Sequence, residues 1–184
     1  MDEKHPLKAQ SPYAATKISA DQLALSYYNS FNLKVKIIRP FNCFGPRQSL
    51  RAFIPTITTQ ILEKKKIVKI GNLNSKRDFT FVSDTVDGFT STIGNKKCIG
   101  ETIQLGTGID FSMKQTLNEI KKITKTKIKF VQDKERMRPK KSEVNRLISL
   151  NKKAKKILKW SPKYSGKDGF NKGLKETVEW FSNK

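Results

Sequence analysis

Tyr13 and Lys17 form the pair with the clearest reactive potential in this sequence. They stand four positions apart, so on a helix their side chains lie about 40° apart on one face, one turn from each other. An ammonium group next to a phenol favours the phenolate, which can take a proton from a hydroxyl group. The pair could therefore act as a general acid and base, although Tyr-x-x-x-Lys spacings also arise by chance on helix surfaces.

A helix has to hold this pair, and the flanking residues predict one. Ser11 followed by proline is typical of a helix start, because serine caps free N–H groups and proline at the first position loses no hydrogen bond. We expect the helix to cover residues 12–29 and to end at Asn32. A buried strand is predicted over residues 33–39, and residues 41–47, rich in turn formers, are predicted to be irregular.

Helical and strand patterns alternate along the rest of the chain, which favours an α/β fold class. Ser112 and Gln115 form a capping-box pattern ahead of a one-sided helix. Helices are predicted over residues 51–64, 84–93, 113–123, 151–158 and 168–181, and strands over 67–70, 78–82, 102–105 and 127–131.

The chain is strongly basic, with 38 Lys and Arg against 16 Asp and Glu in 184 residues and a formal charge of +22. Such a charge can indicate nucleic-acid binding. Most of the excess is lysine scattered over predicted helix faces and turns, and no RNP, zinc-finger or basic-zipper pattern is present. We therefore interpret it as a lysine-rich solvated surface and do not expect a nucleic-acid partner.

The cysteine and histidine content argues against disulfide-rich and metal-cluster proteins. Cys43 and Cys98 are too few for a disulfide framework and fit a reducing compartment, and His5 is the only histidine, so no metal cluster is expected. No window approaches the roughly 20 apolar residues of a membrane span. We expect a cytoplasmic chain with no membrane partner.

Longer motifs surround the reactive pair and occur in order along nearly the whole chain: SPYAATK at 11–17, RPFNCFGPR at 39–47, RDFTFVSD at 77–84, RMRP with SEV at 136–144, and NKKA with WSP at 151–162. Together they resemble the extended short-chain dehydrogenase/reductases of the NAD-dependent epimerase/dehydratase family, which act on nucleotide sugars. Within it they are most similar to sugar-nucleotide 4,6-dehydratases of the UDP-N-acetylglucosamine (legionaminic-acid) and GDP-mannose types.

The resemblance implies a fold and a division of the chain. The fold would be the C-terminal half of a Rossmann-like doubly wound domain plus a small α/β substrate-binding subdomain. Residues 1–50, with the Tyr/Lys helix, would belong to the former. Residues 51–184 would form mainly the latter, with some segments returning to the Rossmann sheet.

The resemblance also implies a reaction. Tyr13 would take the proton from the sugar O4 as C4 gives a hydride to NAD, while Lys17 holds the nicotinamide ribose and favours the phenolate. Loss of water across C5 and C6 and return of the hydride to C6 would give a 4-keto-6-deoxy sugar, a step in cell-surface polysaccharide biosynthesis. A 4-epimerase shares the first step, so this pair does not separate the two activities.

Binding roles follow from the same resemblance. Pro40 and Asn42 would lie beside the nicotinamide, and Asn42 would also reach the sugar or its diphosphate. Arg77 and Arg138 would clamp the diphosphate, a task suited to a planar, permanently charged group. Substrate contacts are also implied for Arg47 and, on the ribose of the nucleotide, Glu143. The alternative for each arginine is that it is an exposed surface charge. The motifs do not decide which nucleotide base or which sugar the substrate carries.

The family's dinucleotide site uses a G-x-x-G-x-x-G loop that this sequence lacks. Gly106-Thr107-Gly108 follows a predicted strand but has no third glycine and lies far downstream of Tyr13, so we reject it as a phosphate cradle. We expect these residues to be the C-terminal part of a larger enzyme, without the ADP half of the NAD site and with little turnover alone. A homodimer or a complementing N-terminal chain could complete it, and a non-catalytic sugar-nucleotide-binding partner is the alternative.

Overall fold

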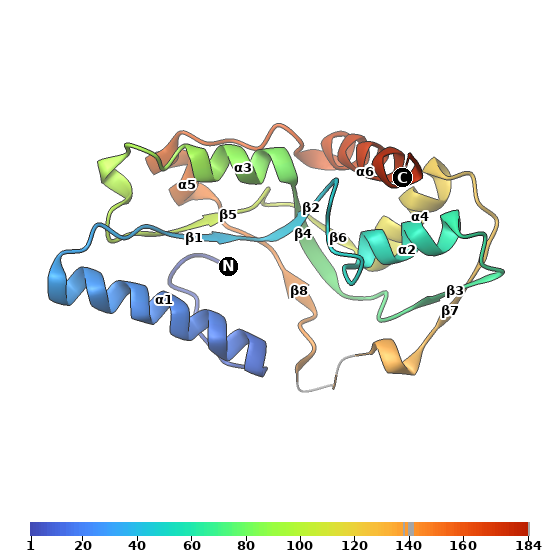
Figure 1. Cartoon of the computed structure of the whole chain (residues 1–184), viewed down its shortest axis with the longest axis horizontal. Helices are drawn as coiled ribbons and strands as arrows, with labels where there is room; N and C mark the ends of the chain where they lie inside the picture. The colour runs from blue at the N-terminus through green and yellow to red at the C-terminus, as the bar shows by residue number, and fades with distance from the viewer. Residues whose placement is uncertain (138, 140–141, 184) are drawn as a thin grey trace.

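The computed structural model describes residues 1–137, 139 and 142–183, so the predicted site residue Arg138 lies outside the described residues. Within these residues six α-helices are interspersed with strands (Figure 1). The helices are α1 (Pro12–Phe31), α2 (Phe53–Leu62), α3 (Val82–Thr90), α4 (Met113–Ile123), α5 (Lys152–Leu158) and α6 (Gly166–Ser182). The strands are β1 (Ile37–Pro40), β2 (Asn42–Phe44), β3 (Ile67–Ile70), β4 (Lys76–Phe81), β5 (Thr102–Leu105), β6 (Asp110–Ser112), β7 (Lys129–Gln132) and β8 (Arg146–Leu147).

Strand pairing is mainly parallel, which confirms the predicted α/β class. β1 pairs with β5, Ile37 lying opposite Thr102, and β3 pairs with β7. β4 joins three strands: β2 and β8 run parallel to it and β6 antiparallel. Since parallel partners require crossover connections, each pair brings together segments far apart in the sequence.

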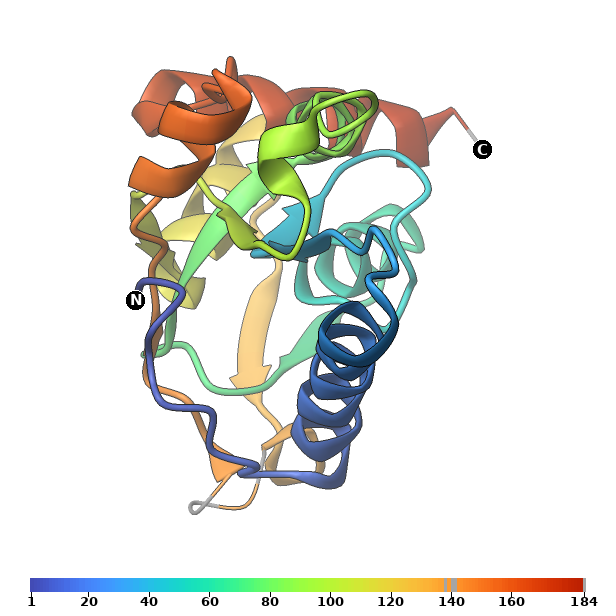
Figure 2. The same cartoon turned by 90° about the vertical axis from the view of Figure 1, so that its left-hand side faces the viewer.

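Two apolar clusters hold these sheets. The larger one lies between α2, α4, α6 and the strands β2, β3 and β4, and contains Phe44, Ile57, Leu117, Phe170 and Leu174. The smaller one packs β5 against α5 and includes Ile103, Leu105, Leu158 and Trp160. Figures 1 and 2 show α3 and α5 on one side of the β1–β5 pair and α1 on the opposite side. None of the helices formed by the described residues is long and apolar enough to cross a membrane.

Helix α1 begins and ends where the sequence predicts. The Ser11 hydroxyl accepts a hydrogen bond from the Ala14 N–H at 3.2 Å, and Asn32 adopts the left-handed conformation, φ 53°, that terminates the helix. No residue of this 20-residue helix is buried, and Phe31 is 73% exposed. Packing against the described residues therefore contributes little to its stability.

Three short strands correct the sequence-based prediction. Residues 42–44, predicted as irregular, form β2, and neither β6 nor β8 was predicted. Each is only two or three residues long, so no alternating pattern can develop. Their extended conformation comes from hydrogen bonding to β4, which the local sequence does not reveal.

Lys159 offers a test of local backbone energetics. It ends α5 in the left-handed conformation, with φ 56° and an exposed side chain. Because a Cβ atom is disfavoured there, Lys159→Gly is expected to raise the free energy of unfolding by about 1 kcal/mol in urea denaturation followed by circular dichroism. The matched control Lys156→Gly, inside the same helix, is expected to lower it by about 1 kcal/mol. Destabilisation by both changes would contradict the strain at residue 159.

Candidate nucleotide-sugar site

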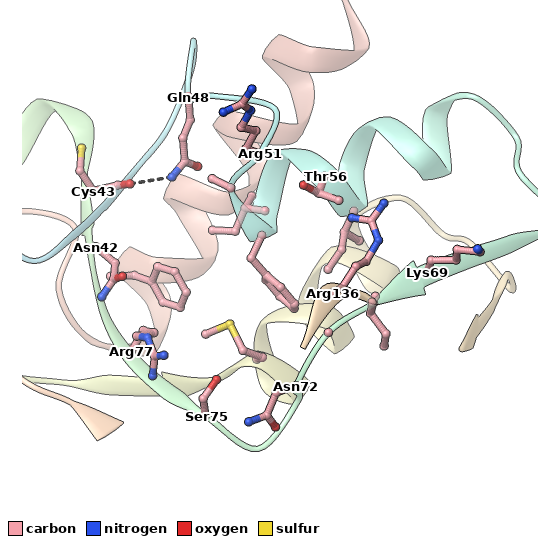
Figure 3. A pocket seen from close by; sticks show the side chains of 18 of the residues that line it. Asn42, Cys43, Gln48, Arg51, Thr56, Lys69, Asn72, Ser75, Arg77 and Arg136 are labelled. Atoms are coloured by element: carbon pink, nitrogen blue, oxygen red, sulfur yellow. Dashed lines mark hydrogen bonds between the residues drawn. The ribbon is translucent and has the colours of Figure 1, made fainter. Parts of the chain in front are cut away.

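A pocket of about 440 Å³ lies where β2, β4, α2 and β3 meet (Figure 3). Its floor is the larger apolar cluster, which contributes Ile54, Ile57, Ile70, Phe79 and Met113. Polar side chains form the walls: Asn42, Gln48, Arg51, Thr56, Lys69, Asn72, Ser75, Arg77, Arg136 and Glu143. An apolar floor with convergent polar groups at the rim is typical of a small-molecule site.

The walls are predominantly cationic. Figure 3 shows Asn42, Cys43 and Arg77 on one side of the pocket and Lys69 and Arg136 on the other. Arg51 is the fourth basic residue of the lining, and Glu143 is its only carboxylate among the described residues. Lys69 and Arg136 share Asp133, at N–O distances of 3.6 and 3.9 Å. This balance of charge favours an anionic ligand such as a diphosphate.

Arg77 is the most firmly held of these cations. Its Nη1 donates to the Val144 carbonyl at 2.7 Å and its Nη2 lies 3.5 Å from Glu143 Oε1. The side chains of Arg77 and Glu143 are only 12% and 17% exposed. The structure thus joins two predicted site residues in one partly buried ion pair, and pre-orders the guanidinium at the pocket wall.

Two further polar groups line the pocket beside Asn42. Gln48 Nε2 donates to the Cys43 carbonyl at 2.7 Å, while its buried Oε1 has no hydrogen-bond partner among the described residues. Burial raises the pKa of the Cys43 thiol, and a hydrogen bond with Thr85 opposes that shift. A largely neutral thiol suits a lining role and not that of a nucleophile.

The reactive pair lies outside this lining. The Lys17 ammonium sits 5.5 Å from the centre of the Tyr13 ring, so α1 brings the two together as their spacing predicts. Tyr13 is 72% exposed. Pro40, at the end of β1, and Arg47, with φ 66°, are exposed and likewise contribute nothing to the lining of this pocket. Of the predicted residues, the pocket brings together Asn42, Arg77 and Glu143.

Sequence reasoning missed part of the lining. Lys69 alternates with buried neighbours along β3, so its pattern indicated only an outward-facing strand residue. Arg136 stands in the RMRP motif, but the resemblance pointed to the second arginine of that motif. Gln48 follows the RPFNCFGPR motif directly, and this position is the only feature of the sequence that could have indicated Gln48 as a pocket residue.

The glycine-containing turn after β5 does not fit the pyrophosphate of NAD. The N–H groups of Thr107 and Gly108, which would have to hold a phosphate, donate to the Asp78 carboxylate at 2.8 and 2.9 Å. The rejection of this turn as a phosphate cradle is therefore confirmed. The exposed phenol and the ammonium on α1 are polar groups that a ribose can use, so these two residues are compatible with the nicotinamide end of the cofactor.

The sequence profile of the family described as GDP-mannose 4,6 dehydratase matches residues 1–173. The chain belongs to this family. It is 33% identical over 172 residues to a UDP-glucuronate 4-epimerase of Thermodesulfobacterium geofontis, covering 92% of this chain and 50% of the relative. It is 31% identical over 183 residues to a dTDP-glucose 4,6-dehydratase of an Actinoplanes species, covering 97% of this chain and 53% of the relative.

A solved structure extends the comparison to the fold. The UDP-glucuronic acid 4-epimerase of Bacillus cereus, in complex with UDP-glucuronic acid and NAD, superposes with a TM-score of 0.84 at 27% identity, over 97% of this chain and 54% of that one. The expected relation to Rossmann-like epimerases and dehydratases is confirmed. The chain spans about half the length of the curated relatives it matches, and those relatives include both 4,6-dehydratases and 4-epimerases.

Proposed function

We propose that this chain provides the nucleotide-sugar pocket and the acid/base pair of an NAD-dependent nucleotide-sugar 4,6-dehydratase. The observation that carries the proposal is the convergence of Asn42, Arg77 and Glu143, from three separate motifs, on one cation-lined pocket. The match of residues 1–173 to the GDP-mannose 4,6 dehydratase family supports this choice of reaction.

The substrate's diphosphate would be bound by the basic wall. Arg77 is held in place by Val144 and Glu143, so its guanidinium charge is already ordered at the pocket wall and would attract phosphate oxygens without losing much conformational freedom. Arg136 adds charge from the opposite wall, and Arg51 adds charge from beside Gln48. We propose that Asn42 contacts the sugar or the diphosphate and that Glu143 also reaches the ribose.

The proposed acid/base residues lie on α1. Tyr13 would take the proton from the sugar O4, and Lys17, whose ammonium lies 5.5 Å from the centre of the Tyr13 ring, would hold the nicotinamide ribose. Pro40 and Asn42 would flank the nicotinamide. Bound NAD would supply the hydride chemistry, as acceptor for the oxidation at C4 and as donor for the reduction at C6 that follows the loss of water across C5 and C6. The high exposure of Tyr13 leaves its hydroxyl accessible to a substrate.

A 4-epimerase is the second candidate, supported by the 33% identity to a UDP-glucuronate 4-epimerase. Both reactions begin with the same proton transfer to Tyr13. They differ in the product: a 4-keto-6-deoxy sugar from the dehydratase, and a sugar of the same mass with inverted C4 from the epimerase. Mass spectrometry and proton NMR of the product discriminate between them.

The partner of α1 would be a second copy of the chain or a complementing chain that carries the glycine-rich loop. No residue of α1 is buried against the rest of the described chain. Its large exposed apolar side chains are Tyr13, Leu23, Tyr27 and Phe31. An apolar helix face of this kind is stable when it is covered by another helix or sheet.

A binding experiment tests the pocket directly. Calorimetric titration of the purified chain with UDP, GDP and dTDP is expected to reveal saturable binding of at least one of them. Arg77→Ala should weaken that binding by about 10- to 100-fold, because a charge-assisted hydrogen bond contributes about 1.5–3 kcal/mol.

Arg146→Ala is the matched control for this titration. Arg146 also lies on a strand and pairs with a carboxylate, Asp110, but it does not line the pocket. Its removal lowers the net charge equally and should change affinity less than twofold at about 0.15 M salt, because its side chain is 59% exposed, lies outside the lining and is screened by solvent and salt. Equal losses in both variants would contradict specific binding at Arg77, and absence of nucleotide binding to the unmodified chain would contradict the proposed function.

A further inference from the structure

We propose that Asp78 is a positioning residue that holds Arg77 and Asn42 in the geometry required to bind the nucleotide sugar. The proposal rests on the proposed function of the pocket. Asp78 lies on β4, is fully buried and is absent from the pocket lining. Its effect on the ligand would therefore be transmitted through the residues it fixes.

Both oxygens of the Asp78 carboxyl group are fully engaged. Oδ1 accepts from the Thr107 N–H at 2.8 Å and from the Thr107 hydroxyl at 2.7 Å. Oδ2 accepts from the N–H groups of Gly108 at 2.9 Å and Ser149 at 3.1 Å. Burying a carboxyl group is unfavourable unless its hydrogen bonds are replaced, and here four donors from two distant segments replace them.

Those two segments meet β4 on this single side chain. Thr107 and Gly108 lie in the turn between β5 and β6, and Ser149 lies two residues beyond β8. The approach is too close for a larger residue at position 106, because a Cβ on Gly106 would lie 2.8 Å from Asp78 Oδ2 and 2.4 Å from Ser149 Cβ. Asp78 thus ties the small β1–β5 unit and the β8 segment to the strand that carries Arg77.

Two contacts connect the hydrogen-bonded Asp78 to the pocket. Leu147 of β8 lies opposite Arg77, and Val144, just before β8, accepts the 2.7 Å hydrogen bond from the Arg77 guanidinium. Fixing Ser149 therefore fixes the segment that orients Arg77. In addition, the main-chain carbonyl of Asp78 accepts a hydrogen bond from Asn42 Nδ2 at 3.4 Å. Displacement of Asp78 would shift both ligand-binding side chains.

Asp84 provides a control with the same structural character. It is also buried, and its carboxyl oxygens accept from the N–H groups of Lys163 at 2.9 Å and Tyr164 at 2.8 Å. These bonds tie α3 to the segment before α6, and none of the three residues lines the pocket. A merely structural role of Asp78 would make the two aspartates equivalent in a binding assay.

The experiment compares Asp78→Asn with Asp84→Asn in the full chain. Each oxygen of the Asp78 carboxyl group accepts two hydrogen bonds, so whichever oxygen Asp78→Asn replaces by NH₂, that NH₂ group faces two donors. Each carboxyl oxygen of Asp84 accepts one main-chain N–H, so the NH₂ group of Asp84→Asn faces one such donor. We expect both variants to lower the unfolding midpoint in calorimetry. Below those midpoints, Asp78→Asn should weaken binding of the best of UDP, GDP and dTDP by about tenfold or more, and Asp84→Asn less than twofold.

Thr107→Val is the milder companion variant, because it removes the hydroxyl bonds to Asp78 Oδ1 and to the Ile109 main chain and keeps the Thr107 N–H that donates to Oδ1. It should weaken nucleotide binding by about two- to fivefold and decides the matter if Asp78→Asn does not fold. Unchanged affinity in the folded variants would overturn the positioning role while leaving the pocket intact. Absence of nucleotide binding to the unmodified chain would instead overturn the proposed function, and the inference with it.

Discussion

Replacing Tyr13 by phenylalanine is expected to lower the turnover of a nucleotide sugar by about 10²- to 10⁴-fold, the usual contribution of a positioned acid/base group. The ring and its contact with Lys17, 5.5 Å from the ring centre, are retained, whereas the group that takes the O4 proton is lost. The fold should be unaffected, because Tyr13 is 72% exposed. Turnover is measured with the chain fused to the part of the Actinoplanes dehydratase that it does not match, which we expect to carry the glycine-rich loop of the family.

Tyr27→Phe is the matched control for this prediction. Tyr27 lies on the same helix, is also exposed, and loses the same hydroxyl group, but no lysine stands four positions after it. Its turnover should stay within twofold of the unmodified fusion. Retention of at least half the activity by Tyr13→Phe in an active fusion would refute the role of Tyr13, whichever product is formed.

Replacing Phe170 by alanine is expected to lower the free energy of unfolding by about 3–5 kcal/mol, a large share of the 5–15 kcal/mol typical of a domain. Phe170 is 2% exposed and lies in a cluster of rings, with centroids 5.5 Å from Phe44, 5.4 Å from Phe79 and 4.1 Å from Phe111. The loss would separate α6 from the strands β2, β4 and β6. Urea denaturation followed by tryptophan fluorescence and circular dichroism measures it.

Phe31→Ala removes the same number of atoms from an exposed site and serves as the comparison. Phe31 is 73% exposed at the end of α1, and alanine has the higher helix propensity. A change within about 0.5 kcal/mol is expected. A similar destabilisation by both variants would show that α1 is covered in solution, and a small effect at Phe170 would contradict the packing of the larger core.

Elements with strong local signals could be predicted from the sequence. The strands over residues 67–70 and 102–105 match β3 and β5, and the Ser112 and Gln115 capping box begins α4 as expected. Alternation, caps and helix-ending residues act within a few positions, so a linear reading recovers them. β2, β6 and β8 were missed because their conformation depends on pairing with β4.

The residues of the candidate site also fall into those that the sequence predicts and those that only the tertiary structure brings together. The sequence by itself determined the Tyr13 and Lys17 pair, because four positions on a helix set their relation without any help from the rest of the chain. The meeting of Arg77 with Glu143, 66 residues away, and the addition of Lys69 and Arg136 to the pocket depended on tertiary structure. The binding of the Asp78 carboxylate by the Thr107 and Gly108 N–H groups also depended on tertiary structure, because no local pattern tells which distant carboxyl group will accept from them.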